Sequence, residues 1–497
     1  MNNLIFLILL CLNIQIFICS NAIFDQKQRF LKELSNQQET CLYVLLDAKS
    51  QSTRIRLYQS QCRRSSQIPV IQTLIPTNSE GRYIFPDRIQ VNKQSIPLAS
   101  VPVNENDLNN YFRIAFNIVN QIKKFYGTYD NIKPFLFLRA SSGLRQMQQE
   151  QQENILNHVR KIFRKQEDFY FLDDSWVRLV QREEEVQYLW LSVNYAYKKI
   201  KHHPLNQFTN LNTVAVIEMG TAYSQIAYSS LSNYNKFIDL PEKTRVQIQT
   251  DTLLDYGSDT VIRSILNNED YSNCFQKTTG FTHQLNDIYG IVEINGNYNF
   301  NNCTNLILKY MNINNCEYPL NDNVQDCSSH SKLKQLSGQK QIVGLSSIYF
   351  AKEELQRKLK LKGDTFSLKD FREQVKKYCS LTLKQQEFLE NQGLFTKCIE
   401  LMWISTFLID GLGLLNNEIT SVYYYQDFVL DWPFGSLLYD ISKIQCDYLD
   451  LKQCSKQILL SDALNIEYNK HISKINGSQL IAPFFIIINL LIVNFLI

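Results

Sequence analysis

The sequence predicts an α/β fold with two lobes, and three observations support this prediction. Short apolar runs alternate along the chain with segments of helical periodicity, which is typical of α/β proteins. Three of the apolar runs end in turns rich in small and hydroxyl residues. Between the second and third runs, residues 201–206 (Lys-His-His-Pro-Leu-Asn) break the pattern and indicate a lobe boundary. We therefore expect a first lobe over residues 36–205 and a second over 206–460.

The individual elements follow from hydrophobic periodicity. Apolar runs of strand length are typical of buried strands, and they occur at residues 42–46, 135–138 and 214–218. Apolar residues at helical spacing predict amphipathic helices, and these lie at residues 107–126, 146–165, 184–199, 347–360, 370–379 and 395–409. Residues 270–335 are rich in Asn, Gly and Cys with weak periodicity, and we expect a disulfide-pinned insertion there.

The composition excludes several classes of protein. Lys and Arg number 51 against 48 Asp and Glu, a net charge of +3, so no bulk positive charge favours nucleic-acid binding. The hydrophobic content of 44% excludes a disordered chain. Only 16 of the 497 residues are glycine, where roughly 7% is usual. A phosphate-binding loop in this chain must therefore form with few glycines.

The N-terminus carries an apolar run, Leu4 to Cys19, followed by the small residues Ser20, Asn21 and Ala22. Its length is that of a secretory signal peptide, although the usual basic start is missing. We expect residues 1–22 to be a cleaved signal. An uncleaved anchor and a buried helix are the alternatives.

The C-terminal tail, residues 476–497, is also apolar. Residues 480–497 are long enough to cross a bilayer as a helix. The small residues Asn476, Gly477 and Ser478 before a tail without a basic flank resemble a glycolipid-anchor signal. Glycolipid anchor and transmembrane tail stay open, and both predict a membrane-anchored protein of the cell surface or endomembrane lumen.

The cysteines agree with this compartment. Ten of the 12 lie outside the leader, an even number that indicates disulfides in a secreted chain. No CxxC pair or HExxH motif occurs, which argues against a zinc site. Asn302-Cys303-Thr304 is an acceptor sequence for N-glycosylation.

The three turns have the chemistry of an anion site. Turns after parallel strands are where α/β proteins bind ligands, because backbone N–H groups and hydroxyls converge there and suit phosphate. Acidic residues close two of the strands, Asp47 and Glu218, and they are candidates to hold a hydrated divalent cation. Taken singly, each turn has the alternative of being an ordinary loop.

The order of these motifs resembles the ecto-apyrase, or nucleoside triphosphate diphosphohydrolase, family of the actin-like ATPase superfamily. The turns at 47–53, 140–145 and 218–225 are similar to that family's Asp-Ala-Gly-Ser-Ser-x-Thr, Ala-Thr-Ala-Gly-x-Arg and Asp-x-Gly-Gly-Ala-Ser-x-Gln motifs. Residues 184–195 resemble its Glu-Glu-Gly-x-Tyr-x-Trp block with Asn-Tyr, and 255–257 and 431–437 resemble its later blocks. The resemblance covers roughly residues 36 to 445.

This resemblance implies two ribonuclease-H-like lobes with a nucleotide cleft between them. It also implies hydrolysis of nucleoside tri- and diphosphates by in-line attack of water, assisted by Ca²⁺ or Mg²⁺. Glu185 would be the general base and Gln225 would orient the water, while Asp47 and Glu218 would hold the metal through its water shell. The expected nucleotide and phosphate contacts are Ser50, Thr53, Ser141, Gly143, Gly220 and Trp432.

The resemblance further implies a crossed disulfide pair, Cys274–Cys316 with Cys303–Cys327, and a local one, Cys379–Cys398. By elimination Cys41 would pair with Cys62 and Cys446 with Cys454.

Departures from the family pattern concentrate at the phosphates. Lys49 and Thr221 replace glycines, Val186 replaces the glycine after the base, and Tyr223 replaces a serine expected to help place water. A Cβ at such positions costs about 1–2 kcal/mol where the backbone is left-handed, and Tyr223 has the size to fill the water site. The alternative function is therefore a catalytically inactive relative that binds nucleotide or has a structural role.

Overall fold

The structure is a computed structural model of the 497-residue chain. It describes residues 40–444 apart from several internal segments. The longer segments left out are 62–69, 75–82, 201–212, 230–235, 240–244, 278–282, 285–290, 312–335 and 383–393.

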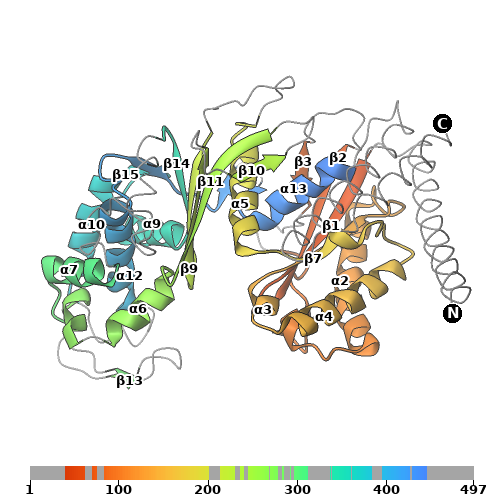
Figure 1. The fold of residues 1–497 in the computed structure, drawn as a ribbon, viewed down its shortest axis with the longest axis horizontal. Helices are drawn as coiled ribbons and strands as arrows, with labels where there is room; N and C mark the ends of the chain where they lie inside the picture. Colours follow the sequence, from red (N-terminus) through yellow and green to blue (C-terminus); the bar gives the residue numbers. More distant parts are fainter. Residues whose placement is uncertain are drawn as a thin grey trace, which may run out of the picture.

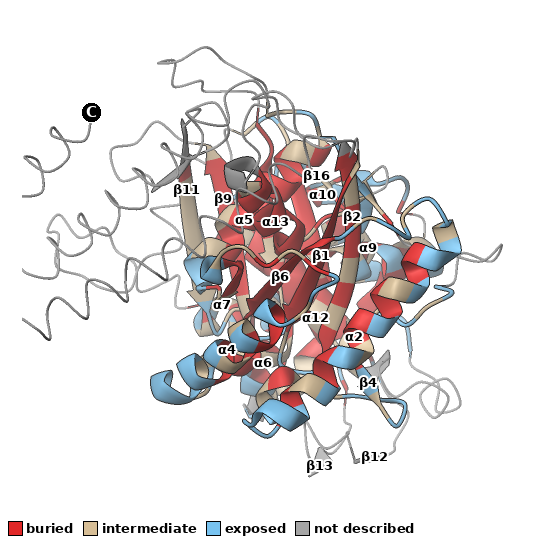
Figure 2. Ribbon diagram, turned by 90° about the vertical axis from the view of Figure 1, so that its right-hand side faces the viewer, coloured by how far each residue is buried: buried red, intermediate tan, exposed pale blue. Residues whose placement is uncertain are grey.

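The first lobe is built on a five-stranded sheet in the order β3-β2-β1-β6-β7. Its strands are β1 (Thr40–Ala48), β2 (Thr53–Gln61), β3 (Ile71–Thr73), β6 (Phe135–Ala140) and β7 (Val177–Leu179). Strand β2 pairs antiparallel with both β1 and β3, whereas β6 pairs parallel with β1 and β7 pairs parallel with β6. The strands β1 and β6 are mostly apolar and almost entirely buried because helices cover both faces (Figure 2).

Helices α2 (Glu105–Tyr126) and α4 (Gln149–Arg164) cover one face of this sheet. The α2 helix begins where the Asn104 side chain accepts a hydrogen bond from the Asp107 N–H, and it ends at Gly127, whose φ is 68°. Its buried side chains follow the predicted spacing, which gives the alternating buried and exposed stripe visible in Figure 2.

The second lobe repeats this topology with one more strand at each edge. Its seven-stranded sheet has the order β10-β11-β9-β8-β14-β16-β15. The strands are β8 (Ala215–Met219), β9 (Tyr223–Ser229), β10 (Lys236–Asp239), β11 (Arg245–Leu254), β14 (Ile342–Ser346), β15 (Thr365–Ser367) and β16 (Glu418–Thr420). As in the first lobe, an antiparallel β8-β9-β11 meander continues through parallel pairing of β8 with β14 and of β14 with β16.

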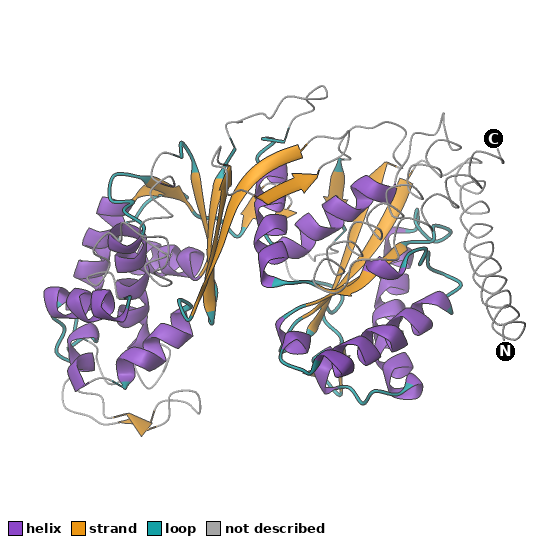
Figure 3. Cartoon of the chain, viewed as in Figure 1, coloured by secondary structure: helices purple, strands orange, loops and turns teal. Residues whose placement is uncertain are grey.

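Helices pack on the face of the second sheet that is turned away from the first lobe (Figure 3). They are α6 (Ser258–Leu266), α7 (Phe300–Tyr310), α9 (Ser347–Lys358), α10 (Leu368–Ser380) and α12 (Leu394–Thr406). Their apolar side chains form one core with those of the sheet.

Two helices lie between the sheets, α5 (Arg182–Ala196) and α13 (Trp432–Ile444) (Figure 1). The α13 helix comes late in the chain, but its Phe434, Leu437 and Ile441 belong to the same apolar cluster as the residues of β1, β6 and α5. The division into lobes at 36–205 and 206–460 stays a prediction, and α13 packs on elements of the first range. This helix packs on α5 and β1, which the sequence analysis did not predict.

The strands and helices predicted from periodicity are confirmed, with ends that differ by a few residues. The strand expected at 42–46 is longer because its pairing with β2 continues to Ala48. The helix expected at 395–409 is α12 followed by a π-helical turn, Phe407–Gly411.

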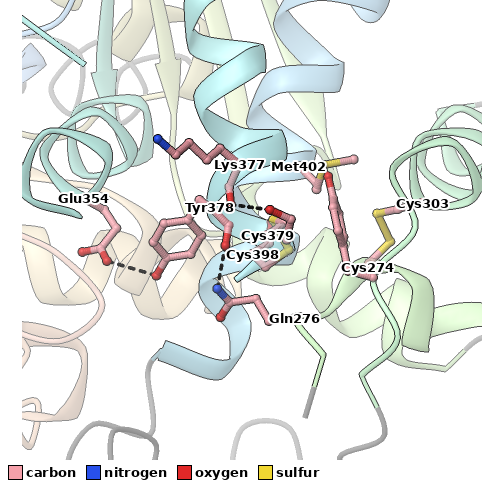
Figure 4. Close-up of a disulfide and its surroundings, with 11 residues drawn as sticks. Cys274, Gln276, Cys303, Glu354, Lys377, Tyr378, Cys379, Cys398 and Met402 are labelled. Carbon is pink, nitrogen blue, oxygen red and sulfur yellow. Dashed lines mark hydrogen bonds between the residues drawn. A yellow bond between two sulfur atoms is a disulfide. The ribbon is translucent and has the colours of Figure 1, made fainter. Parts of the chain in front are cut away.

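The disulfides confirm one prediction and correct another (Figure 4). Cys379–Cys398 joins α10 to α12 as expected. Cys274 is bonded to Cys303, with the two Cα atoms 4.9 Å apart, so the expected crossed pair of Cys274 and Cys303 with later cysteines is wrong. The reason is that the 3₁₀ helix ending at Cys274 packs directly against α7, which carries Cys303.

Several predictions fall outside the described residues. These are the signal at 1–22, the tail at 476–497, the break at 201–206 and the cysteines at 62, 316, 327, 446 and 454. Cys41 is disulfide-bonded. Within the described part of the chain, no helix has both the length and the apolar character needed to cross a membrane.

Candidate functional site

The first two predicted turns meet at the end of paired strands. Parallel pairing of β1 with β6 places Ala48 beside Ala140, so both strands end at the same edge of the sheet. The backbone N–H of Ser141 donates to the Ala48 carbonyl at 3.0 Å. Glycine is favoured at 143, because a Cβ there would make a tight contact with the Lys49 carbonyl oxygen at 3.0 Å. The predicted phosphate loops of the first lobe therefore lie against each other.

Glu185 lies at the start of α5, where it is 1% exposed. Its Oε1 accepts a hydrogen bond from Arg145 Nη2 at 2.9 Å, and its Oε2 accepts one from the Tyr223 hydroxyl at 2.9 Å. Burial raises the pKa of Glu185, and the neighbouring Arg145 opposes that rise. Since Tyr223 begins β9 in the second lobe, this carboxylate links the two lobes.

Asp47 is fully buried near the end of β1. Lys49 Nζ lies 3.5 Å from its Oδ2, and Arg56 Nη2 lies 3.9 Å from the same oxygen. Arg56 also pairs with Asp431, which comes directly before α13. Within the described part of the chain, both carboxylate oxygens of Asp47 accept no hydrogen bond. A buried carboxylate whose oxygens accept no hydrogen bond is able to take an additional cation or a water shell.

Glu218 occupies the equivalent place on β8 in the second lobe. Its Oε1 accepts a hydrogen bond from Ser346 Oγ at 2.8 Å. Ser346 ends β14 with φ of 59°, a left-handed conformation that is uncommon for a residue other than glycine. Burial raises the pKa of Glu218, and the Ser346 hydrogen bond and the charge of Lys49 oppose that rise. Strained backbone next to a carboxylate is typical of functional sites.

The other predicted residues fall into two groups. Ser50 is exposed on the first turn, and Trp432 begins α13 with Lys49 Nζ 5.8 Å from its ring centre. Thr53 is fully buried and its hydroxyl accepts a hydrogen bond from Tyr111 of α2 at 2.7 Å. The structure therefore leaves Ser50 accessible to a ligand, whereas Thr53 supports the turn from inside the lobe.

Three further predicted residues lie at or near the turns, where Ser141 and Gln225 are buried and Gly220 is partly exposed. Ser141 is buried, and its hydroxyl lies 3.4 Å from the Ala48 carbonyl. Gly220 donates its N–H to the Tyr223 carbonyl, which closes the β8–β9 turn. Gln225 is buried and donates from Nε2 to the Arg182 carbonyl at 2.8 Å, so its amide fixes the start of α5.

The glycine substitutions do not strain the backbone as expected. Lys49 and Thr221 are absent from the described non-glycine residues with positive φ, so their Cβ atoms carry no left-handed penalty. A glycine is needed instead at 257, where a Cβ would lie 2.3 Å from the Thr221 carbonyl carbon. The departures therefore act through their side chains, not through backbone geometry.

The donor set suits a hydrated cation better than a directly coordinated one. Within the described ranges, no three His, Cys, Asp or Glu side chains gather into a metal-binding group. Asp47 and Glu218 nevertheless provide two carboxylates, and the oxygens of Asp47 accept no hydrogen bond from the described residues. Mg²⁺ commonly binds to one or two carboxylates and keeps its remaining positions for water and substrate phosphates. Asp47 and Glu218 fit this mode of binding, in which two carboxylates hold a hydrated cation.

Four residues in the site were not predicted to be functional: Arg145, Arg56, Asp431 and Ser346. Arg145 and Asp431 lie inside the motifs that carry the family resemblance, and that position is the signal that points to them. Arg56 and Ser346 carry no such signal, because only the packing of β2 and β14 brings them to the carboxylates.

Known proteins with similar sequences and structures agree on one family. A model of the GDA1/CD39 (nucleoside phosphatase) family matches residues 33–461. The chain is 21% identical to nucleoside-diphosphatase mig-23 of Caenorhabditis elegans, over 87% of this chain and 82% of that protein. It is also 21% identical to ectonucleoside triphosphate diphosphohydrolase 1 of Bos taurus, over 81% of this chain and 82% of that protein.

Among solved structures, a nucleoside triphosphate hydrolase of Neospora caninum matches with a TM-score of 0.59 and 13% identity. The match covers 87% of this chain and 99% of that one. At this level of identity, the match shows a shared fold.

Proposed function

The chain belongs to the GDA1/CD39 (nucleoside phosphatase) family, and on that premise we propose that it hydrolyses nucleoside tri- and diphosphates with a divalent cation. The observation that carries the proposal is the buried Glu185 carboxylate at the junction of the two lobes, held by Arg145. A buried carboxylate with a raised pKa is suited to take a proton from an attacking water.

The residues of the chain have distinct roles in this mechanism. Ser50 and the backbone around Gly143 receive the terminal phosphate, and Arg145 holds Glu185 in place. Glu185 orients the attacking water and accepts its proton, while Gln225 keeps the start of α5 in position. Phosphoryl transfer needs mainly positioning and charge stabilisation, which these groups provide. Ca²⁺ or Mg²⁺ held through water by Asp47 and Glu218 would neutralise charge on the phosphate oxygens.

A phosphate-release assay tests this proposal. We expect the purified chain to release phosphate from ATP or ADP with Ca²⁺ or Mg²⁺. Replacing the base, Glu185→Gln, is expected to lower kcat by about 10²–10⁴-fold. The neighbouring Glu183→Gln serves as a matched control, because Glu183 is exposed on the first turn of the same helix. Release that is absent, or equal in the Glu185→Gln variant, contradicts the proposal.

One observation favours a second function, that of a nucleotide-binding relative without activity. The Tyr223 hydroxyl donates a hydrogen bond to Oε2 of Glu185, the oxygen that an attacking water would otherwise contact. Under this alternative the wild-type chain binds nucleotide but releases no phosphate. Under the first proposal, Tyr223 withdraws from Glu185 when substrate and water enter.

We further propose that the protein is tethered to a membrane with its lobes in the lumen of the secretory pathway or outside the cell. The disulfides Cys274–Cys303 and Cys379–Cys398 support an oxidising compartment. The apolar run from Leu4 to Cys19 and the tail at 480–497 support entry into that pathway and attachment to its membrane. Release by an enzyme that cleaves glycolipid anchors would identify such an anchor, and retention in the bilayer would identify a transmembrane tail.

A further inference from the structure

Lys49 is a cation built into the first phosphate turn. Its backbone N–H donates to the Ser52 carbonyl at 2.9 Å, which fixes the turn. Its ammonium lies 3.5 Å from Asp47 Oδ2, and its side chain is 33% exposed where that of Asp47 is fully buried. The charge therefore lies between the buried carboxylate and the space from which a ligand approaches.

The surroundings of Lys49 leave its charge only partly neutralised. Asp47 is shared with Arg56, which is itself paired with Asp431. Glu218 of the second lobe interacts electrostatically with Lys49 but forms its hydrogen bond with Ser346. The ammonium thus pairs with Asp47 at 3.5 Å without a hydrogen bond and stays one-third exposed, so N–H donors remain available to a phosphate oxygen.

Trp432 restrains the same side chain from the α13 side. The indole ring centre lies 5.8 Å from Lys49 Nζ, within the range of a cation–π interaction. Because Trp432 is 6% exposed, its ring is held by the first-lobe core. The lysine therefore has support on two sides, from Asp47 and from Trp432, and its position does not depend on a bound ligand.

We propose that Lys49 supplies to the terminal phosphates a positive charge that a divalent cation would otherwise have to supply, so that this protein binds nucleotide phosphates without a metal. The same charge beside Asp47 weakens binding of the free metal ion. This inference rests on the proposed function, since it concerns the same phosphate site. A lysine bound to phosphate as a point charge is well suited to this role.

The test measures binding and not activity. Isothermal titration of the full chain with the non-hydrolysable analogue AMP-PNP in EDTA compares wild type with Lys49→Met, which keeps much of the side-chain length and removes the charge. We expect wild type to bind and Lys49→Met to bind about 10- to 100-fold more weakly, as for loss of a hydrogen bond from a charged donor. Lys49→Arg should retain most of the affinity, and Lys369→Met, an exposed lysine on α10, should retain all of it.

A second titration uses Ca²⁺ alone, and here Lys49→Met should bind more tightly than wild type. If wild type and Lys49→Met bind AMP-PNP equally well in EDTA, or if both bind only after Ca²⁺ or Mg²⁺ is added, the proposed role of Lys49 is overturned. The proposed function remains in either case. No AMP-PNP binding by either protein with or without metal overturns both. Circular dichroism of each variant confirms that the fold is retained, so a loss of affinity reports on the charge.

Discussion

Glu185 shows how a single residue in this protein is tuned by opposing effects. Removal from water raises its pKa above the ordinary 4.5, while Arg145 and the Tyr223 hydroxyl favour the ionised form. A general base works only when ionised, so activity falls as pH decreases through this pKa. The acid limb of the rate profile is therefore expected above the pH at which an exposed glutamate titrates.

Replacing Tyr223 with Phe tests this balance. The change removes a hydrogen bond that favours the charged carboxylate, so the pKa of Glu185 rises further. The acid limb of kcat/KM against pH, which reports the free enzyme, should move to higher pH. Tyr83→Phe is the control, because Tyr83 is an exposed tyrosine whose hydroxyl meets Tyr424 and not Glu185. An unchanged acid limb in Tyr223→Phe would show that Glu185 is not the titrating base.

At the scale of elements, the close crossing of α5 and α13 depends on one glycine. A Cβ on Gly435 would lie 1.8 Å from the Tyr188 carbonyl oxygen, so no other residue fits without moving a helix. This contact places Trp432 and Asp431 beside the first turn, where they meet Lys49 and Arg56. Glycine at 435 is therefore required for the packing of α13 on α5, and this packing also fixes where Trp432 and Asp431 lie in the site.

The variant Gly435→Ala should lower the free energy of unfolding by about 3 kcal/mol, the upper range for overpacking a core. Urea denaturation of the full chain, followed by circular dichroism, measures the change in the free energy of unfolding. Gly411→Ala is the matched control, since its Cβ would lie 3.3 Å from the flexible Met311 Sδ and has room to be accommodated. Equal stability of the two variants would mean that α5 and α13 do not cross as closely as described.

At the scale of the whole molecule, the carboxylates of the site come from both lobes. Asp47 and Glu185 belong to the first lobe and Glu218 to the second, and Tyr223 and Lys49 connect the two sets. A ligand that contacts the turns of both lobes is therefore expected to stabilise their arrangement. A purely structural surface protein would lack this coupling.

Thermal unfolding in the presence of AMP-PNP and Mg²⁺ measures the coupling. Ligand at 100 times its Kd stabilises the folded state by about 2.7 kcal/mol, which corresponds to roughly 3 °C in Tm for a chain of this size. Adenosine without phosphates provides the control, because it lacks the groups that the turns are proposed to bind. No shift at millimolar AMP-PNP would favour a structural or recognition role for the protein.

The sequence by itself determined several of the buried strands and amphipathic helices, and it suggested the chemical character of the site. Apolar runs of strand length and helices of regular period are local properties, so β1, β6, β8 and α2 could be predicted from neighbouring residues alone. The ordered motifs also led to the prediction of Glu185, Asp47 and Glu218 as site residues, because each lies within a short block that resembles the family pattern.

Only the tertiary structure decided which side chains meet. The contact of Tyr223 with Glu185, the disulfide Cys274–Cys303 and the return of α13 to the first lobe all join residues that lie far apart in the chain. The burial of Thr53 likewise depends on Tyr111 of another element. Such contacts result from the packing of whole helices and sheets, and local periodicity carries no information about which distant element will cover a given face.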